Sequence, residues 1–190
     1  APAWIADAVR RWRSQYERPV TTRLQLTAEA AAAPASADMP RDGFDDKEQV
    51  ERVENFLRSI GLTQNFAPLI LFFGHGSGSR NNPHLSAYDC GACSGKHGGP
   101  NARVFAAMAN RPAVRAGLLA RGLEIPAVCW FIAAEHNTCD DSVEWYDLDL
   151  VPPEFETALD TLVGQLADAC RAHAAERCRR LASAPKAPSP

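Results

Sequence analysis

The side chains best suited to chemistry gather in residues 74–103, "GHGSGSRNNPHLSAYDCGACSGKHGGPNAR". This segment holds three of the five histidines and two of the six cysteines. Imidazole and thiolate together form the ligand set that zinc favours. Cys90 and Cys93 form a C-x-x-C. The sequence has no second C-x-x-C and no histidine pair with the spacing of a zinc finger, either of which would complete a four-ligand site. The segment therefore indicates a metal site that it does not complete, with these candidate ligands: His75, His84, Cys90, Cys93 and His97.

Two other chemistries compete for the same segment. Hydrolysis would use Ser77, but a nucleophile elbow needs glycine two residues before and after the serine, where this sequence has His75 and Ser79. The glycines of "GHGS" would instead suit backbone N–H donation to an oxyanion. Phosphate binding is suggested by "GHGSGS" and by "GGPNAR" ahead of a helix, yet neither matches G-x-G-x-x-G and no G-K-[ST] is present. Both alternatives remain open and are weaker than the metal.

Two apolar segments must position these side chains. Residues 69–73, "LILFF", form a short apolar run without alternation, which is typical of a strand buried on both faces of a parallel sheet. A second such strand, 128–134, runs into the polar cluster "EHNTCDD" at 135–141. Open α/β sheets bind ligands at the carboxyl ends of their strands. This placement makes His75 and Cys90 the strongest ligand candidates and leaves His136 evenly balanced between a structural and a functional role.

The helical periodicity of other segments predicts the helices that cover the sheet. The pattern of residues 46–59 predicts a helix that is capped by Asp45 or Asp46 and stopped by Gly61. We therefore predict an α/β fold with a mostly parallel sheet flanked by helices. Residues 1–43 form an N-terminal helix and linker, 44–182 the α/β region, and 183–190 a disordered tail. The other predicted helices cover 101–110, 112–121 and 153–181.

The remaining thiols and one more histidine are interpreted as structural. Cys129 lies within the second strand, and Cys170 and Cys178 lie on the last helix, where small apolar packing is the usual role of a cysteine. His173 falls on the core-facing side of the same helix, so we expect it to be packed there.

Bulk composition bounds the class of protein. The chain has 190 residues, is 46% hydrophobic and carries a formal charge of -3, which favours a folded domain and argues against nucleic acid as a partner. The longest apolar run, 67–73, is far shorter than the roughly 20 residues that cross a bilayer. The first residues do not resemble a secretory signal, so we expect a cytosolic setting and reduced cysteines.

The ordered motifs "GHGS", "NNP", "DCGAC" and "HNT", spread over residues 43–181, resemble the DabA family, whose members are probable inorganic carbon transporter subunits. This resemblance implies a fold similar to a β-carbonic anhydrase, incomplete in this chain. It also implies a Zn2+ ion held by a Cys-x-Asp pair from one strand end and by a histidine and a cysteine from another. Mapped onto this sequence, the latter two ligands are His75 and Cys90. The residues expected to lie around them without binding the metal are Ser77, Asp89, Cys93 and His136.

One part of the family pattern is missing. The family's Cys-x-Asp pair lies in an earlier C-x-D-x-R segment, and members of the family are several times longer than this chain. Here Cys139 and Asp141 form the only Cys-x-Asp, and no arginine completes it. We therefore expect a carboxy-terminal portion that carries half of the zinc site and is not catalytically complete alone.

The resemblance also implies a function. It implies zinc-dependent, vectorial hydration of CO2 to bicarbonate within an energy-coupled uptake complex. The implied partner is an integral membrane protein similar to DabB that translocates protons or cations, and this chain would lie peripherally on the cytoplasmic face of the cell inner membrane. The alternative is a non-catalytic scaffold in which Cys90, Cys93 and one or two histidines close a structural zinc site.

Overall fold

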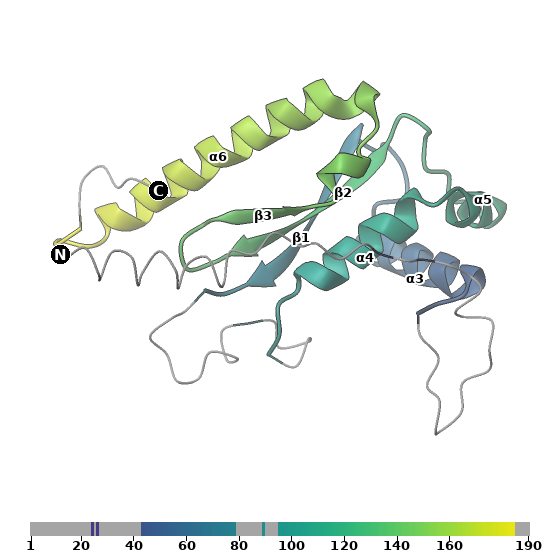
Figure 1. The fold of residues 1–190 in the computed structure, drawn as a ribbon, viewed down its shortest axis with the longest axis horizontal. Helices are drawn as coiled ribbons and strands as arrows, with labels where there is room; N and C mark the ends of the chain where they lie inside the picture. Colours follow the sequence, from purple (N-terminus) through teal and green to yellow (C-terminus); the bar gives the residue numbers. More distant parts are fainter. Residues whose placement is uncertain (1–23, 25, 27–42, 79–88, 90–94, 185–190) are drawn as a thin grey trace.

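The computed structural model describes residues 24, 26, 43–78, 89 and 95–184 of the chain. Within these residues a three-stranded sheet has α4 on one side and α6 on the other (Figure 1). The predicted N-terminal helix and most of the predicted linker and tail lie outside the described residues. The helices are α3 (Asp46–Ser59), α4 (Gly99–Asn110), α5 (Pro112–Ala120) and α6 (Glu156–Arg179), and the short 3-10 turns are η3 (Leu148–Leu150) and η4 (Pro153–Phe155).

The sheet consists of β1 (Leu69–Gly76), β2 (Trp130–Asn137) and β3 (Val143–Tyr146), with β2 in the middle. β1 runs parallel to β2, and β3 runs antiparallel to β2. The sequence patterns did not predict β3, so the prediction of a mostly parallel sheet is corrected to a mixed one in the described part of the chain. The α/β class, with helices flanking the sheet, is confirmed.

The main core lies between the sheet, α3, α4 and α5. Phe72 of β1 and Phe131 of β2 point to this side, where Phe105 of α4 packs with its ring centroid 4.5 Å from that of Phe72. Leu57 of α3 and Leu118 of α5 are fully buried in the same core. Burying such side chains removes apolar surface from water and is the main stabilising contribution to the fold.

Helix α3 begins and ends where its sequence signals predict. Asp45 accepts a hydrogen bond from the backbone N–H of Glu48 at 2.8 Å, and the Glu48 side chain accepts one from the N–H of Asp45 at 2.9 Å. This reciprocal pair is a capping box, which satisfies two amide groups that the helix itself leaves unpaired. Gly61 takes the predicted left-handed conformation, with φ +75°.

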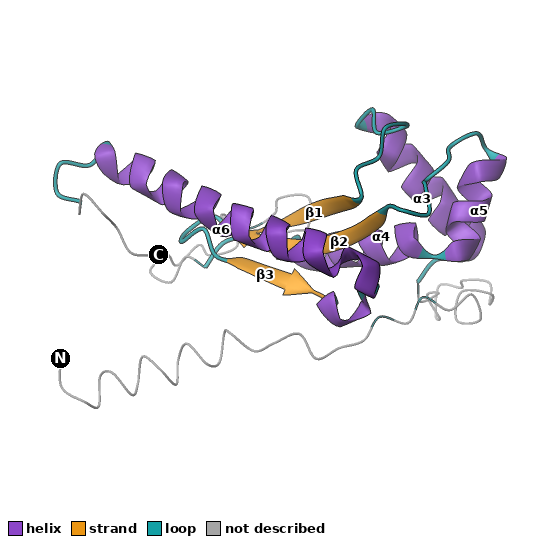
Figure 2. Cartoon of the chain, turned by 90° about the horizontal axis from the view of Figure 1, so that it is seen from above, coloured by secondary structure: helices purple, strands orange, loops and turns teal. Residues whose placement is uncertain are grey.

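Helix α6 follows η4 and runs along the side of the sheet opposite α4 (Figure 2). Its start is anchored, because Phe155 and Leu159 are buried and the Phe155 ring lies 6.2 Å from that of Trp130. The rest of its apolar face is only half-buried, and His173 is 56% exposed. The prediction that His173 packs in the core is therefore wrong, because this part of α6 lies beside the β2–β3 turn, where His173 faces Asp141 instead of apolar side chains. No described helix has the length and apolar content needed to span a membrane.

Candidate functional site

The carboxyl ends of β1 and β2 lie side by side and bring the two polar segments together. His75 is the register partner of His136, and Gly76 that of Asn137. The pairing continues past the strands, since the Thr138 N–H donates to the Gly76 carbonyl at 3.0 Å. The prediction that two strand ends deliver polar residues to one edge of the sheet is confirmed. His75 itself is half-buried there.

A hydrogen bond joins the end of β1 to Asp89, which comes later in the chain. The backbone N–H of Ser77 donates to Asp89 Oδ1 at 2.9 Å, and the Asp89 side chain is almost completely buried. Ser77 is buried as well, and its hydroxyl lies 3.3 Å from the Cys139 thiol. The structure therefore brings Ser77 and Asp89 together two residues beyond His75. The predicted ligand Cys90, and also His84 and Cys93, lie outside the described residues.

The centre of the described site is Glu135, which was not among the residues predicted from the sequence to form the site. Its buried carboxylate accepts the backbone N–H of Gly99 at 3.0 Å and the Tyr146 hydroxyl at 3.4 Å. Its other oxygen lies 2.5 Å from Nδ1 of His97. A Cβ atom on Gly76 would lie 2.3 Å from that oxygen, so a larger residue there would force the Glu135 side chain to shift. The available signal was strand parity, because Glu135 and His136 are consecutive and must face opposite sides of the sheet.

The charge of Glu135 sets the electrostatics around it. Its hydrogen bond raises the pKa of His97, against the opposing effect of burial. Burial raises the pKa of the Tyr146 hydroxyl, and the neighbouring carboxylate raises it further. Burial and Glu135 likewise raise the pKa of Glu144. The site thus favours positive charge on His97 and disfavours further negative charge.

The His97–Glu135 pair predicts a pH-dependent stability. Because the folded pKa of His97 is raised above its ordinary value, its contribution is complete below about pH 6.5 and is lost as the pH rises through the folded pKa. Asp89 and Glu144 also face His97 and act in the same direction. We expect urea unfolding to show a stability advantage of wild type over His97→Gln that shrinks between pH 6 and pH 9. An advantage that grows over this range would contradict the assignment.

His136 belongs to a second cluster on the α6 side of the sheet, opposite Glu135, and its register partner His75 lies on this same face. The Nε2 of His136 lies 3.2 Å from Oδ1 of the buried Asp141, which takes a left-handed backbone conformation with φ 60°. The other carboxylate oxygen pairs with Arg177 and lies 3.4 Å from Nδ1 of His173, so it ties the end of α6 to the β2–β3 turn. Cys139, the other half of the Cys-x-Asp, is exposed.

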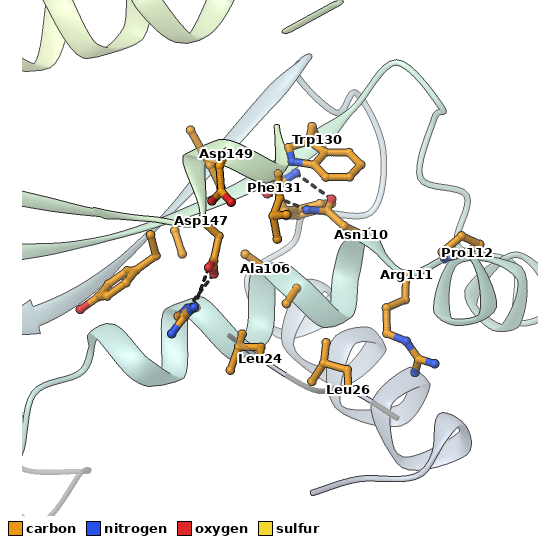
Figure 3. Close-up of a pocket in the computed structure, with 16 residues that line it drawn as sticks. Leu24, Leu26, Ala106, Asn110, Arg111, Pro112, Trp130, Phe131, Asp147 and Asp149 are labelled. Carbon is orange, nitrogen blue, oxygen red and sulfur yellow. Dashed lines mark hydrogen bonds and ion pairs between the residues drawn. The ribbon is translucent and has the colours of Figure 1, made fainter. Parts of the chain in front are cut away.

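A cavity of about 660 Å3 lies between α4, β2 and β3, on the α4 side of the sheet (Figure 3). Its polar walls are internally paired. Arg103 donates twice to Asp147 at 2.6 Å, and the Asn110 side chain exchanges two hydrogen bonds with the backbone of Phe131. Leu24 lines it as well, and so does Tyr146 of β3, whose hydroxyl reaches Glu135. The cavity therefore adjoins the candidate site, although neither His75 nor Glu135 lines it.

The described residues contain one of the two predicted metal ligands. Among them, no three histidine, cysteine, aspartate or glutamate side chains converge as a metal site would require. Cys129 is buried, as predicted, and burial raises the pKa of its thiol. Cys170 and Cys178 lie half-buried on α6, as expected for structural residues.

The fold and site define a mixed α/β protein with a strand-end cluster of histidines and carboxylates. The family model described as probable inorganic carbon transporter subunit DabA matches residues 1–189, and the chain belongs to this family. A relative from Dechloromonas aromatica, named probable inorganic carbon transporter subunit DabA, is 72% identical over 189 residues, which are 100% of this chain and 19% of the relative. A protein of the same name from Methylococcus capsulatus is 56% identical over 190 residues, covering 100% of this chain and 18% of the relative.

The chain thus spans about a fifth of the length of these relatives. A third relative of the same name, from Nitrosococcus oceani, is 54% identical over 171 residues, covering 90% of this chain and 15% of that protein. No solved structure matches the chain. The resemblance to a β-carbonic anhydrase fold therefore stays a prediction.

Proposed function

We propose that His75 and Cys90 are two ligands of a zinc site at which CO2 is hydrated to bicarbonate during inorganic carbon uptake. The relatives are named as subunits of a probable inorganic carbon transporter, which supports the uptake role. The zinc site and the hydration step rest on the donor types at the strand end and on the motif that contains them.

The observation that supports this proposal most directly is the hydrogen bond between the Ser77 N–H and Asp89 Oδ1, 2.9 Å long. Ser77 follows His75 by two residues, and Asp89 directly precedes Cys90. The contact therefore closes the loop at points adjacent to both proposed ligands. Because the Asp89 side chain is buried, water competes little for its hydrogen bond with the Ser77 N–H.

The donor set suits zinc, which binds imidazole nitrogen and thiolate sulfur in a four-coordinate arrangement. The chemistry that zinc supplies when bound is Lewis acidity, which lowers the pKa of water toward neutrality. In this proposal His75 binds from a strand end held by the β1–β2 pairing, and the Ser77–Asp89 bond positions the return of the chain. The remaining ligands would come from a Cys-x-Asp segment elsewhere in a polypeptide of the relatives' length.

We further propose that the partner is an integral membrane protein, similar to DabB, that translocates protons or cations. This chain would then lie peripherally on the cytoplasmic face of the cell inner membrane. The word "subunit" in the relatives' names supports an assembly with other proteins. Co-purification of a polypeptide of the relatives' full length with such a membrane protein, in detergent, would test the pairing.

The zinc proposal predicts a specific pattern of metal loss. In a polypeptide of the relatives' full length that carries this sequence, we expect about one zinc ion per chain by elemental analysis. His75→Ala and Cys90→Ser should each lower zinc content at least about 10-fold, because each removes a direct ligand. Cys93→Ser is the matched control and should retain zinc.

Two outcomes would contradict this assignment. Equal zinc loss in Cys90→Ser and Cys93→Ser would favour the structural scaffold. So would stoichiometric zinc binding by residues 1–190 alone together with loss of the fold on chelation, since structural zinc contributes directly to folding.

A further inference from the structure

The outer edge of β1 is open in the described part of the chain. β1 pairs on one side with β2 and is the outer strand on that side of the sheet (Figure 2). Its sequence, "LILFFGHG", is apolar for its first five residues. Natural proteins protect edge strands with charges, prolines, bulges or a covering element. Residues 69–73 carry none of these side chains, although they form an edge.

The hydrogen-bond pattern shows which backbone groups face outward. The Trp130 N–H donates to the Pro68 carbonyl at 2.8 Å, and the Thr138 N–H to the Gly76 carbonyl at 3.0 Å. In a parallel pair every second residue directs its N–H and C=O toward the partner, so the even-numbered residues of β1 face β2. The odd-numbered residues face outward, and the Gly98 N–H indeed reaches the His75 carbonyl from that side at 2.7 Å.

Three residues remain on the open part of the edge, namely Leu69, Leu71 and Phe73. None of their backbone groups has a partner on the outer side among the described residues. Unpaired backbone groups on an apolar strand are costly once they are buried, so such a strand requires either water or a partner. The edge therefore presents the kind of backbone groups with which an added strand would pair.

Exposed apolar side chains flank this edge on both faces. Phe73, on the α6 side, is 45% exposed. On the α4 side, Phe56 and Ile60 at the end of α3 are 40% and 52% exposed, and the Phe56 ring lies 5.4 Å from that of Phe72. A strand added here would contact apolar groups above and below, which is the environment of a central strand that is apolar on both faces.

We propose that the outer edge of β1, over residues 69–73, pairs with an apolar strand from the same polypeptide outside residues 1–190. A protein of the relatives' length contains enough other residues to supply this strand, because this chain matches only 19% of the length of the Dechloromonas relative. A second copy fits less well, since a five-residue edge buries far less than the roughly 1,200 Å2 of a stable interface. One end of the added strand would lie beside His75. The proposal does not depend on zinc or on CO2 hydration.

Hydrogen–deuterium exchange on the full-length Dechloromonas relative, read at single-residue level, tests whether the edge is covered. The amides at the positions of Ile70 and Phe72 face β2 and serve as internal controls. We expect the amides at the positions of Leu71 and Phe73 to exchange within about 10-fold of these controls. An alternating pattern, with the outward amides at least about 100-fold faster, would overturn the proposal. Protection that is lost on dilution to monomer would also overturn it, in favour of a second copy.

Photo-cross-linking then identifies the occupant. A benzophenone amino acid replaces the residue at the position of Phe73 in the same full-length protein. The expected product is an intramolecular cross-link to a peptide outside the region that matches residues 1–190. A cross-link between two copies, or one to a peptide within the matching region, would overturn the assignment. The same probe at the position of Val128, which is 72% exposed, controls for non-specific capture.

Discussion

A Gly74→Ala substitution is expected to lower the free energy of unfolding by about 3 kcal/mol or more, because no space exists for a methyl group there. A Cβ atom at this position would lie 2.2 Å from the backbone nitrogen of Gly99 and 2.3 Å from the carbonyl carbon of Gly98. Both contacts are with backbone, which has no rotamer to change. The start of α4 would have to move away from β1, and urea unfolding would measure the cost.

Gly164 provides the matched control for this prediction. It lies within α6, and a Cβ atom there would meet nothing within 4 Å. Gly164→Ala should therefore stabilise the protein by up to about 1 kcal/mol, since alanine loses less backbone entropy in a helix. Similar unfolding midpoints for the two alanine variants would refute the close approach of β1 and α4.

The second large effect is expected at the centre of the core. Phe131 on β2 is 1% exposed and packs against Phe72, with ring centroids 5.9 Å apart. Phe131→Ala should cost about 3 to 5 kcal/mol, because it removes buried apolar surface and leaves a cavity. Thermal and urea unfolding would both report this loss.

The control for Phe131 is Val128, three residues earlier. Its side chain is 72% exposed, so Val128→Ala should change stability by less than about 0.5 kcal/mol. A loss at Val128 comparable to that at Phe131 would mean that β2 is buried differently from the packing described above.

Sequence patterns predicted the elements whose signals are local. The bounds of α3 follow from the Asp45–Glu48 capping box and from Gly61, all of which are readable in the sequence. The two parallel strands were predicted with the correct order along the chain, but each extends three residues beyond its predicted end. Pairing between neighbouring strands holds the polar ends of β1 and β2 in extended form, and this effect is not visible in either segment alone.

Features that depend on distant contacts could not be predicted. β3 has only four residues, and its pairing with β2 depends on the tight turn between the Asn137 N–H and the Ser142 carbonyl. Glu135 becomes the centre of the site only because α4 begins beside it, 36 residues earlier in the chain. His173 was misplaced because helical periodicity gives a face but does not show how far along the helix that face stays in contact with the sheet.

The start of α4 bears on how this protein can handle anions. The Gly99 N–H donates to Glu135, Pro100 has no N–H, and the N–H groups of Asn101 and Ala102 both reach the Gly98 carbonyl. A helix start usually attracts phosphate or carboxylate ligands through its unpaired N–H groups. Here the protein's own carboxylate already serves as that anion. An anion from solution would therefore find the N–H groups at this helix start already occupied.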